Sequence, residues 1–419
     1  MLKILRQNFQ LFLNPKPVRS EPYAAKGRDG ILSLEALRRA RSEIMSWPGY
    51  RPTKLRDLKG LATAVGIRSI LYKDEGARFG LGSFKALGGA YAVASYLQGA
   101  VEARTGVRPS TADLAAGKFR DVTSSIIVTC ATDGNHGRSV AWGAQKFGCR
   151  CIIYVHAAVS QGRRAAIAAY GADVRRVAGT YDDAVRQAAK DAAANGWQVV
   201  SDTSYEGYTE VPRDVMQGYG VIMDEIVDQL PEGAFPTHVF VQGGVGGLAA
   251  SICSYLWESF ADKSPMFFVA EPEQAQCLLL SAKAGRPTSD TGALDTIMAG
   301  LACGEVSLLA WNILDVGVDA FIAIEDEAAA ETMRVLADGR FGDEPVVAGE
   351  SAVAGLAAML LLAGEPETRR SANLDSNSVV LVIGTEGATD PMVYSGIVGR
   401  PAETVAPGWA SALPPKDDG

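Results

Sequence analysis

Lys85 follows a glycine-rich turn and precedes an alanine-rich run, in the segment GLGSFKALGGAYAVASYL. Glycines favour turns and alanines favour helices, so the pattern predicts a lysine at the start of a helix. The positive end of the helix dipole favours the neutral amine of such a lysine, and the neutral amine is the form that reacts with a carbonyl group to give an imine. Taken alone, the segment fits a surface lysine equally well.

A polar turn, ATDGNHG at 131–137, lies between the strand-like sequence SSIIVTC and the helix-like sequence GRSVAWGAQ. This order places Thr132, Asp133, Gly134 and Asn135 at the carboxyl end of a parallel strand, where α/β sheets bind ligands. Free N–H groups at the helix start could hold a carboxylate there. The alternative is a capped turn, in which Asp133 or Asn135 accepts hydrogen bonds from the helix.

A glycine-rich loop separates a strand from a helix in THVFVQGGVGGLAAS, and its residues are Gly243, Gly244, Val245, Gly246 and Gly247. Backbone N–H groups can converge on a phosphate in such a loop because no Cβ atom stands in the way. The loop lacks the Gly-Lys-Ser/Thr of a Walker motif and the spacing of the G-x-G-x-x-G dinucleotide motif. It therefore indicates a phosphate cup of another kind.

A fourth candidate, Thr385, comes directly after the apolar sequence VVLVIG. Its hydroxyl would again lie at the carboxyl end of a strand, where it could meet a ring nitrogen of a ligand or merely cap a turn.

From about Ser124, short β-branched runs alternate with alanine-rich stretches, a rhythm that predicts β-α-β units and parallel sheets. The segment DVMQGYGVIMDEIVDQL is expected to form one helix. Two such series, separated near 202–212, predict an α/β fold with two lobes, each built on a mostly parallel sheet flanked by helices. The first eighty residues hold few β-branched runs and should wrap the larger lobe. The tail from Arg400, with four prolines, should be an irregular arm.

The composition favours a globular protein with small ligands. The 419 residues are 47% hydrophobic, carry a formal net charge of −8 and contain no long block of one charge sign, which argues against a nucleic-acid surface or a polybasic membrane patch. No apolar run reaches the length of a membrane span. The six cysteines lack C-x-x-C spacing, no metal-ligand spacing is found and no signal peptide is recognised, so we expect a cytoplasmic protein with reduced thiols and no metal.

The motifs GSFK, G-N-H-G, GGVGG and G-T-E-G occur in an order that resembles the fold type II pyridoxal-phosphate (PLP) enzymes, the group of serine and threonine dehydratases and tryptophan synthase β. Within that group, ATDGNHG, DTSYEGYTEVPRDVMQGY at 202–219 and GTEGATDP at 384–391 are similar to the diaminopropionate ammonia-lyases. The similarity runs from about residue 20 to residue 395. It implies a large PLP-binding lobe formed by 1–85 and 206–419, a small lobe over 86–205 and a homodimer.

The resemblance also implies roles for the cofactor-binding residues. Lys85 would form the imine link with pyridoxal 5′-phosphate, and Asn135 would donate a hydrogen bond to the phenolic oxygen of the cofactor. Gly243–Gly247 would bind its phosphate. Thr385 would face the pyridine nitrogen, and a neutral hydroxyl there suits elimination better than transamination.

Asp133 distinguishes this chain from simple dehydratases, which usually carry a small neutral residue at the matching position. A carboxylate beside the substrate repels another carboxylate but attracts a β-ammonium group, which favours 2,3-diaminopropionate over serine. Asp202 matches a second acid of the family, although it could also be a turn or cap residue. With Thr132 and Gly134, Asp133 would bind the substrate. Lys85 and Asp133 could then serve as bases on opposite faces, so that both enantiomers give pyruvate and ammonia.

Ser83 favours a dehydratase instead, because with Phe84 and Lys85 it gives the S-F-K sequence of the dehydratases. A serine/threonine-type dehydratase is therefore the first alternative. A non-catalytic nucleotide-binding protein that uses the GGVGG loop is the second.

Overall fold

The computed structural model describes residues 3–17, 21–132 and 134–409, and the chain forms two compact units. Among the described residues, the larger unit holds those up to Leu34 together with Pro52–Ala77 and Ile222–Trp409, and the smaller unit holds Glu35–Arg51 and Arg78–Val221. Both are mixed α/β with parallel strands, so the predicted fold class is confirmed. The lobe boundaries inferred from the sequence stay a prediction.

The sheet of the larger unit is built from β1 (Phe9–Leu13), β2 (Lys54–Asp57), β3 (Ser69–Asp74), β8 (His238–Gln242), β9 (Met266–Pro272), β10 (Ala320–Ile324) and β11 (Val379–Gly384). Its seven strands follow the order β1-β10-β9-β8-β11-β3-β2. The five inner strands are parallel, and the two edge strands β1 and β2 are antiparallel to their neighbours. All residues of β8, β10 and β11 are buried, as is typical of parallel strands covered on both faces.

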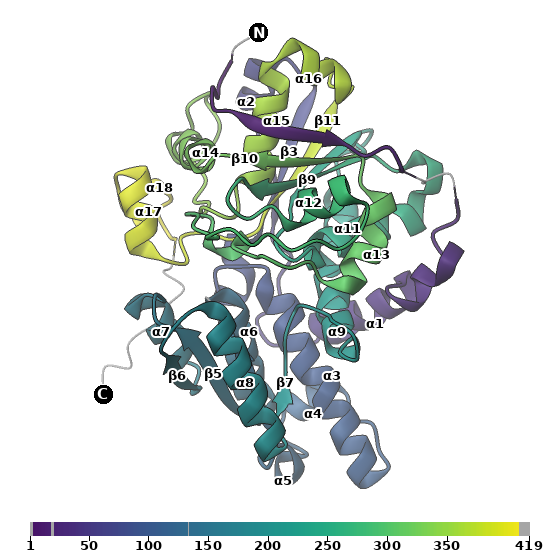
Figure 1. Ribbon diagram of the computed structural model, residues 1–419, viewed down its shortest axis with the longest axis vertical. Helices are drawn as coiled ribbons and strands as arrows, with labels where there is room; N and C mark the ends of the chain where they lie inside the picture. The colour runs from purple at the N-terminus through teal and green to yellow at the C-terminus, as the bar shows by residue number, and fades with distance from the viewer. Residues whose placement is uncertain (1–2, 18–20, 133, 410–419) are drawn as a thin grey trace. The chain divides into compact units, whose positions relative to one another are not determined.

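The helices that lie mainly in the larger unit are α2 (Lys59–Val65), α10 (Val221–Gln229), α11 (Gly247–Phe260), α12 (Cys277–Ala284), α13 (Leu308–Gly317), α14 (Asp326–Asp338), α15 (Ala354–Gly364), α16 (Pro366–Ser371), α17 (Pro391–Val398) and α18 (Ala402–Val405). Short 3₁₀ turns cover Ala25–Gly30, Glu75–Gly80, Ala261–Lys263 and Ala299–Leu301. The helix α15 is apolar on all sides and packs against β8, β9 and β10 (Figure 1). It therefore forms a central part of the core.

The smaller unit has a four-stranded parallel sheet in the order β6-β5-β4-β7, formed by β4 (Ile127–Ala131), β5 (Arg150–His156), β6 (Asp173–Val177) and β7 (Gln198–Val199). Its helices are α1 (Leu34–Met45), α3 (Lys85–Thr105), α4 (Thr111–Ala115), α5 (Arg120–Thr123), α6 (Asn135–Phe147), α7 (Gln161–Ala168), α8 (Tyr181–Asn195) and α9 (Glu210–Tyr219). The helices α6 and α8 pack on β4 and β5, and α3 packs against both α6 and α9 (Figure 1).

The expected single helix over 214–230 is in fact two helices, because α9 ends at Tyr219 and α10 begins at Val221. Between them lies Gly220, where a Cβ atom would stand 2.0 Å from Leu37 Cδ1. The chain thus turns where it passes close to α1, a contact that no local pattern reveals.

Two expectations for the chain ends are also corrected. The first eighty residues contribute β1, β2 and β3, and β3 pairs with β11 inside the larger sheet rather than wrapping around it. The expected irregular arm contains α18.

Across residues 3–17, 21–132 and 134–409, no helix has the length and hydropathy that a membrane span requires.

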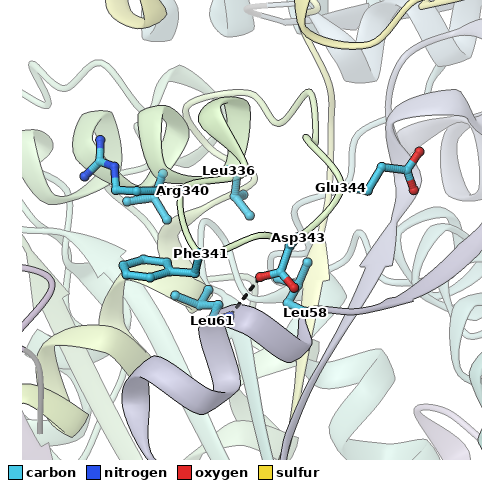
Figure 2. Close-up of a pocket in the computed structure, with 9 residues that line it drawn as sticks. Leu58, Leu61, Leu336, Arg340, Phe341, Asp343 and Glu344 are labelled. Atoms are coloured by element: carbon cyan, nitrogen blue, oxygen red, sulfur yellow. Dashed lines mark hydrogen bonds between the residues drawn. The ribbon is translucent and has the colours of Figure 1, made fainter.

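A small pocket in the larger unit lies between the start of α2 and the loop that follows α14 (Figure 2). The carboxylate of Asp343, which lines this pocket, accepts a hydrogen bond from the backbone N–H group of Leu61 at 2.8 Å (Figure 2). It also accepts one from the N–H group of Gly60 at 2.7 Å. These are donors of the first helical turn, which have no partner within the helix. None of the predicted site residues lines this pocket, so the interaction serves the fold.

We expect Asp343→Ala to lower the free energy of unfolding by about 1–2 kcal/mol, because it leaves two helix-start donors without their acceptor. Urea denaturation followed by circular dichroism measures this difference. The matched control is Glu344→Ala, which removes a neighbouring, largely exposed carboxylate that pairs with Arg56 and should cost less than about 0.5 kcal/mol. Equal effects of the two substitutions would contradict the capping role.

Candidate active site

Lys85 is the first residue of α3, as the sequence predicts. The turn before it contains Gly80 and Gly82 with φ of 73° and 81°, a left-handed conformation that glycine adopts without strain. The hydroxyl of Ser139, in α6, donates to the backbone carbonyl of Lys85 at 2.6 Å and accepts from the N–H of Ala90 at 3.0 Å. The start of α3 is therefore fixed against α6.

The amine of Lys85 forms an ion pair with Asp202, with Nζ at 2.5 Å from Oδ2. Asp202 follows β7, and the two side chains are 19% and 17% exposed, so the pair is largely shielded from water. Burial alone would raise the pKa of Asp202, but the Lys85 ammonium holds it well below its usual range. Asp202 is thus a charged partner of Lys85 rather than a simple turn residue.

His136 lies on the other side of Asp202, with Nδ1 at 3.8 Å from Oδ2. Its Nε2 lies 2.8 Å from the carbonyl oxygen of Val200, and its buried Nδ1 has no hydrogen-bond partner among the described residues. Burial lowers the pKa of His136, although the Asp202 carboxylate opposes this effect. The ring is therefore neutral near pH 7, and we assign the proton to Nε2, which donates to Val200.

Two aromatic rings complete the surroundings of the Lys85 amine. Nζ lies 5.3 Å from the ring centroid of Phe84 and 5.8 Å from that of Tyr219, and the two rings are 4.6 Å apart. Tyr219, the last residue of α9, is only 1% exposed. The Lys85 amine, whether charged or neutral, thus lies beside the rings of Phe84 and Tyr219.

The polar turn at 131–137 is capped by Thr132, whose hydroxyl oxygen accepts the N–H groups of Gly134 and Gly137 at 3.1 Å each. Asn135 begins α6. Asp133 lies outside the described residues. The roles predicted for Thr132, Asp133, Gly134 and Asn135 stay predictions, and the cap leaves the hydroxyl proton of Thr132 available as a donor.

The glycine loop lies in the larger unit, between β8 and α11. Gly244 and Gly246 have φ of 58° and 96°, and a Cβ atom at Gly243 would lie 2.8 Å from Cγ of Glu271. The helix α11 begins at Gly247, and none of its first N–H groups is capped by a side chain. A loop in which only Val245 carries a Cβ atom, and which leads into uncapped helix N–H groups, fits a phosphate ester such as that of PLP.

Thr385 comes directly after β11, the neighbour of β8 in the sheet, and is 4% exposed. Its hydroxyl oxygen accepts a long hydrogen bond, 3.4 Å, from Nε2 of Gln242, which also donates to the carbonyl of Ile383 at 2.8 Å. The hydroxyl proton of Thr385 then remains able to donate to a ring nitrogen. Gln242 thus links the carboxyl ends of β8 and β11.

Sequence reasoning assigned no role to Gln242, Tyr219 or Glu271. Glu271 is fully buried beneath the glycine loop, and its carboxylate accepts the N–H groups of Leu278 and Leu279 at the start of α12. Burial raises the pKa of Glu271 to about 8. The only signals for Gln242 and Glu271 were polar residues in otherwise apolar strands, VFVQ and FFVAE, and Tyr219 had none beyond its place in the QGY sequence.

Comparisons with known proteins agree with this geometry. The family model described as pyridoxal-phosphate dependent enzyme matches residues 46–385. The diaminopropionate ammonia-lyase of Escherichia coli is 38% identical over 385 residues, which cover 90% of this chain and 94% of that protein.

Two solved structures of the Escherichia coli diaminopropionate ammonia-lyase are similar to the chain, each at 36% identity. The complex with the aminoacrylate-PLP azomethine reaction intermediate gives a TM-score of 0.83 and covers 94% of this chain and 97% of that chain. The complex with D-serine gives a TM-score of 0.85 and covers 96% and 99%. The chain belongs to the diaminopropionate ammonia-lyase family of the pyridoxal-phosphate-dependent enzymes.

Proposed function

We propose that this protein eliminates ammonia from the β-carbon of 2,3-diaminopropionate, so that one molecule of substrate and one of water give pyruvate and two of ammonia. The observation that carries the proposal is the shielded ion pair of Lys85 and Asp202 at the start of α3. It places an amine that can gain or lose a proton next to a carboxylate that stays charged. Such an amine can take part in proton transfer at a substrate carbon. Family membership supports the same activity.

In this proposal, Lys85 binds the cofactor covalently and, once released from it, accepts the Cα proton at Nζ. Asp202 holds Nζ in position and stabilises the ammonium form that results, because their charges are opposite and water is largely excluded. PLP supplies an electron sink for the negative charge at Cα. His136 remains neutral and limits the movement of the Asp202 carboxylate.

The residues of the larger unit would hold the cofactor by its two ends. The N–H groups of Gly243–Gly247, with Val245 fixed through its carbonyl to the N–H of Ser307 at 2.9 Å, would bind the phosphate. Thr385, oriented by Gln242, would donate its hydroxyl proton to the pyridine nitrogen. Asn135 would bind the phenolic oxygen, as the family resemblance implies.

The choice of substrate depends on Asp133, supported by Thr132 and Gly134. A carboxylate at this turn would attract the β-ammonium of diaminopropionate and would give serine no comparable contact. Ser83, buried in an S-F-K sequence as in dehydratases, favours the second candidate, a serine/threonine-type dehydratase. The D-serine complex of the Escherichia coli relative makes this candidate worth testing.

We further propose two lobes, 1–85 with 206–419 and 86–205, for which the division into two compact units provides support. A homodimer in the cytoplasm is inferred from the family. Sedimentation velocity of the purified protein tests the dimer, which would be overturned by a single species of 44.2 kDa.

Lys85→Ala should abolish both pyruvate release from diaminopropionate and the visible absorbance of the cofactor-loaded protein, because it removes the amine that would bind the cofactor. Lys85→Arg should do the same while keeping a positive charge next to Asp202, since arginine does not lose its proton. The control Lys146→Ala removes a lysine of α6 whose Nζ lies 4.9 Å from the ring centroid of Trp142, and it should leave both signals intact. Activity or visible absorbance in either Lys85 variant would refute the proposal.

Gly244→Asp should weaken PLP retention by at least about tenfold, because a negative charge would stand where a phosphate must bind. A Cβ atom at Gly244 would lie 3.6 Å from its nearest neighbours, so it meets no clash, although any side chain is strained at its φ of 58°. Gly233→Asp is the matched control, since Gly233 has a similar φ of 69° but lies in an exposed loop. Equilibrium dialysis measures the affinity of both variants, and equal retention by both would show that the loop is only a packing turn.

Asp133→Asn should keep the cofactor bound but reduce turnover of one enantiomer of diaminopropionate far more than the other, because only one face of the substrate would lose its base. Loss of a positioned acid or base typically costs a factor of about 10² to 10⁴. Pyruvate release from D- and L-2,3-diaminopropionate and from serine, with parent and variant, measures this. Equal small losses would limit Asp133 to a helix cap, and faster turnover of serine by the parent would favour the dehydratase.

A further inference from the structure

We propose that Tyr219 is a positioning residue for Lys85, and that its hydroxyl holds the lysine amine in place when the amine is not bonded to the cofactor. The inference rests on the proposed function, because it assumes that Lys85 is the reacting lysine. It concerns the smaller unit alone, in which Tyr219, Lys85 and Asp202 all lie.

The first observation is a buried hydroxyl without a hydrogen bond of normal geometry. The Tyr219 side chain is almost fully buried, and no described residue gives its oxygen such a bond, although an interaction with the Lys85 side chain opposes the rise in its pKa. A buried polar group normally has a partner, because leaving it unsatisfied destabilises the fold. The Lys85 amine is thus the group that this hydroxyl is placed to bind.

The second observation is that this hydroxyl belongs to the surroundings of the Lys85 amine. Nζ lies 5.8 Å from the centroid of the phenol ring. Burial raises the pKa of Tyr219 strongly, and the Lys85 ammonium is close enough to oppose that rise, while the Asp202 carboxylate adds to it. The phenol therefore stays protonated at any pH at which the enzyme works.

The third observation is that the backbone is shaped to bring Tyr219 this close. A Cβ atom at Gly88, in α3, would lie 2.4 Å from Cε1 of Tyr219, and a Cβ atom at Gly218 would lie 2.4 Å from the carbonyl oxygen of Leu87. A glycine inside a helix costs about 0.5–1 kcal/mol relative to alanine. Two glycines at this helix contact indicate that close approach of the phenol to the first turn of α3 is required.

The chemistry of the hydroxyl suits both states of the lysine. Its oxygen can accept a hydrogen bond from the ammonium, and its proton can be donated to the lone pair of the neutral amine. Asp202 can serve only the protonated amine, because a carboxylate has no proton to donate. Tyr219 therefore offers Lys85 a contact that persists when the amine loses its proton.

The test compares Tyr219→Phe with the parent, starting from cofactor-free protein. When PLP is added, we expect the visible absorbance to develop at least about tenfold more slowly in the variant than in the parent. A tenfold lower rate corresponds to the loss of one hydrogen bond to a reacting group. The affinity for pyridoxine 5′-phosphate, which has no aldehyde, should stay within about twofold, because it measures the phosphate and ring contacts alone. The melting temperature should be unchanged or higher, since an unsatisfied hydroxyl is removed.

The matched control is Tyr91→Phe, which removes another buried phenol from α3 whose charged neighbours are Asp214 and Glu43 rather than Lys85. It should react with PLP at the parent rate. In steady state, Tyr219→Phe should lower kcat by a similar factor and leave KM within about threefold, because the amine and not the substrate loses its contact.

Reaction of Tyr219→Phe with PLP at the parent rate overturns the inference. So does an equal slowing in Tyr91→Phe, or a joint loss of melting temperature and pyridoxine 5′-phosphate affinity, which would show a structural role. The proposed function is tested separately by the parent. A parent that gains visible absorbance but releases no pyruvate from diaminopropionate overturns that function and leaves the Tyr219 measurement valid.

Discussion

The ion pair of Lys85 and Asp202 is the interaction on which the smaller unit is organised. Removing one member of a buried pair typically costs about 3–5 kcal/mol, because the remaining charge is left without compensation, so both ends must be fixed. Ser139 fixes the lysine end through the backbone of α3. At the other end, the hydroxyl of Tyr208 accepts the N–H of Ser201 at 2.9 Å and donates to the carbonyl of Val199 at 3.0 Å, which holds the chain just before Asp202.

In the proposed site, the larger unit would offer N–H groups and one hydroxyl to the anionic, aromatic cofactor. Adjacent parallel strands place their carboxyl ends side by side, and β8 and β11 are adjacent. In the glycine loop after β8, Gly243 has no room for a side chain, because Glu271 lies directly beneath it. Gln242, the last residue of β8, links the glycine loop to the end of β11 through its hydrogen bonds to Ile383 and Thr385.

Local patterns predicted the helix start at Lys85, the alternation of strands and helices after Ser124, and the glycine loop, because each depends on residues that are neighbours in the chain. What they could not predict depends on contacts between distant segments. The strand β3 is recognised only through its pairing with β11, and the break at Gly220 only through Leu37. The roles assigned to the individual site residues stay predictions.

A comparison with the fully buried Lys73 explains why we propose Lys85 as the reactive lysine. Nζ of Lys73 donates to Glu225 at 2.7 Å, to the carbonyl of Thr53 at 2.9 Å and to Gln229 at 2.9 Å, which satisfies all three ammonium protons with acceptors. Its side chain is 0% exposed. Such a lysine is locked in its charged form, because a neutral amine would leave these acceptors without donors. Lys85 is 19% exposed and has beside it the Tyr219 hydroxyl, which can also donate. A buried lysine therefore becomes reactive through partners that tolerate the loss of its proton, and burial by itself is not enough.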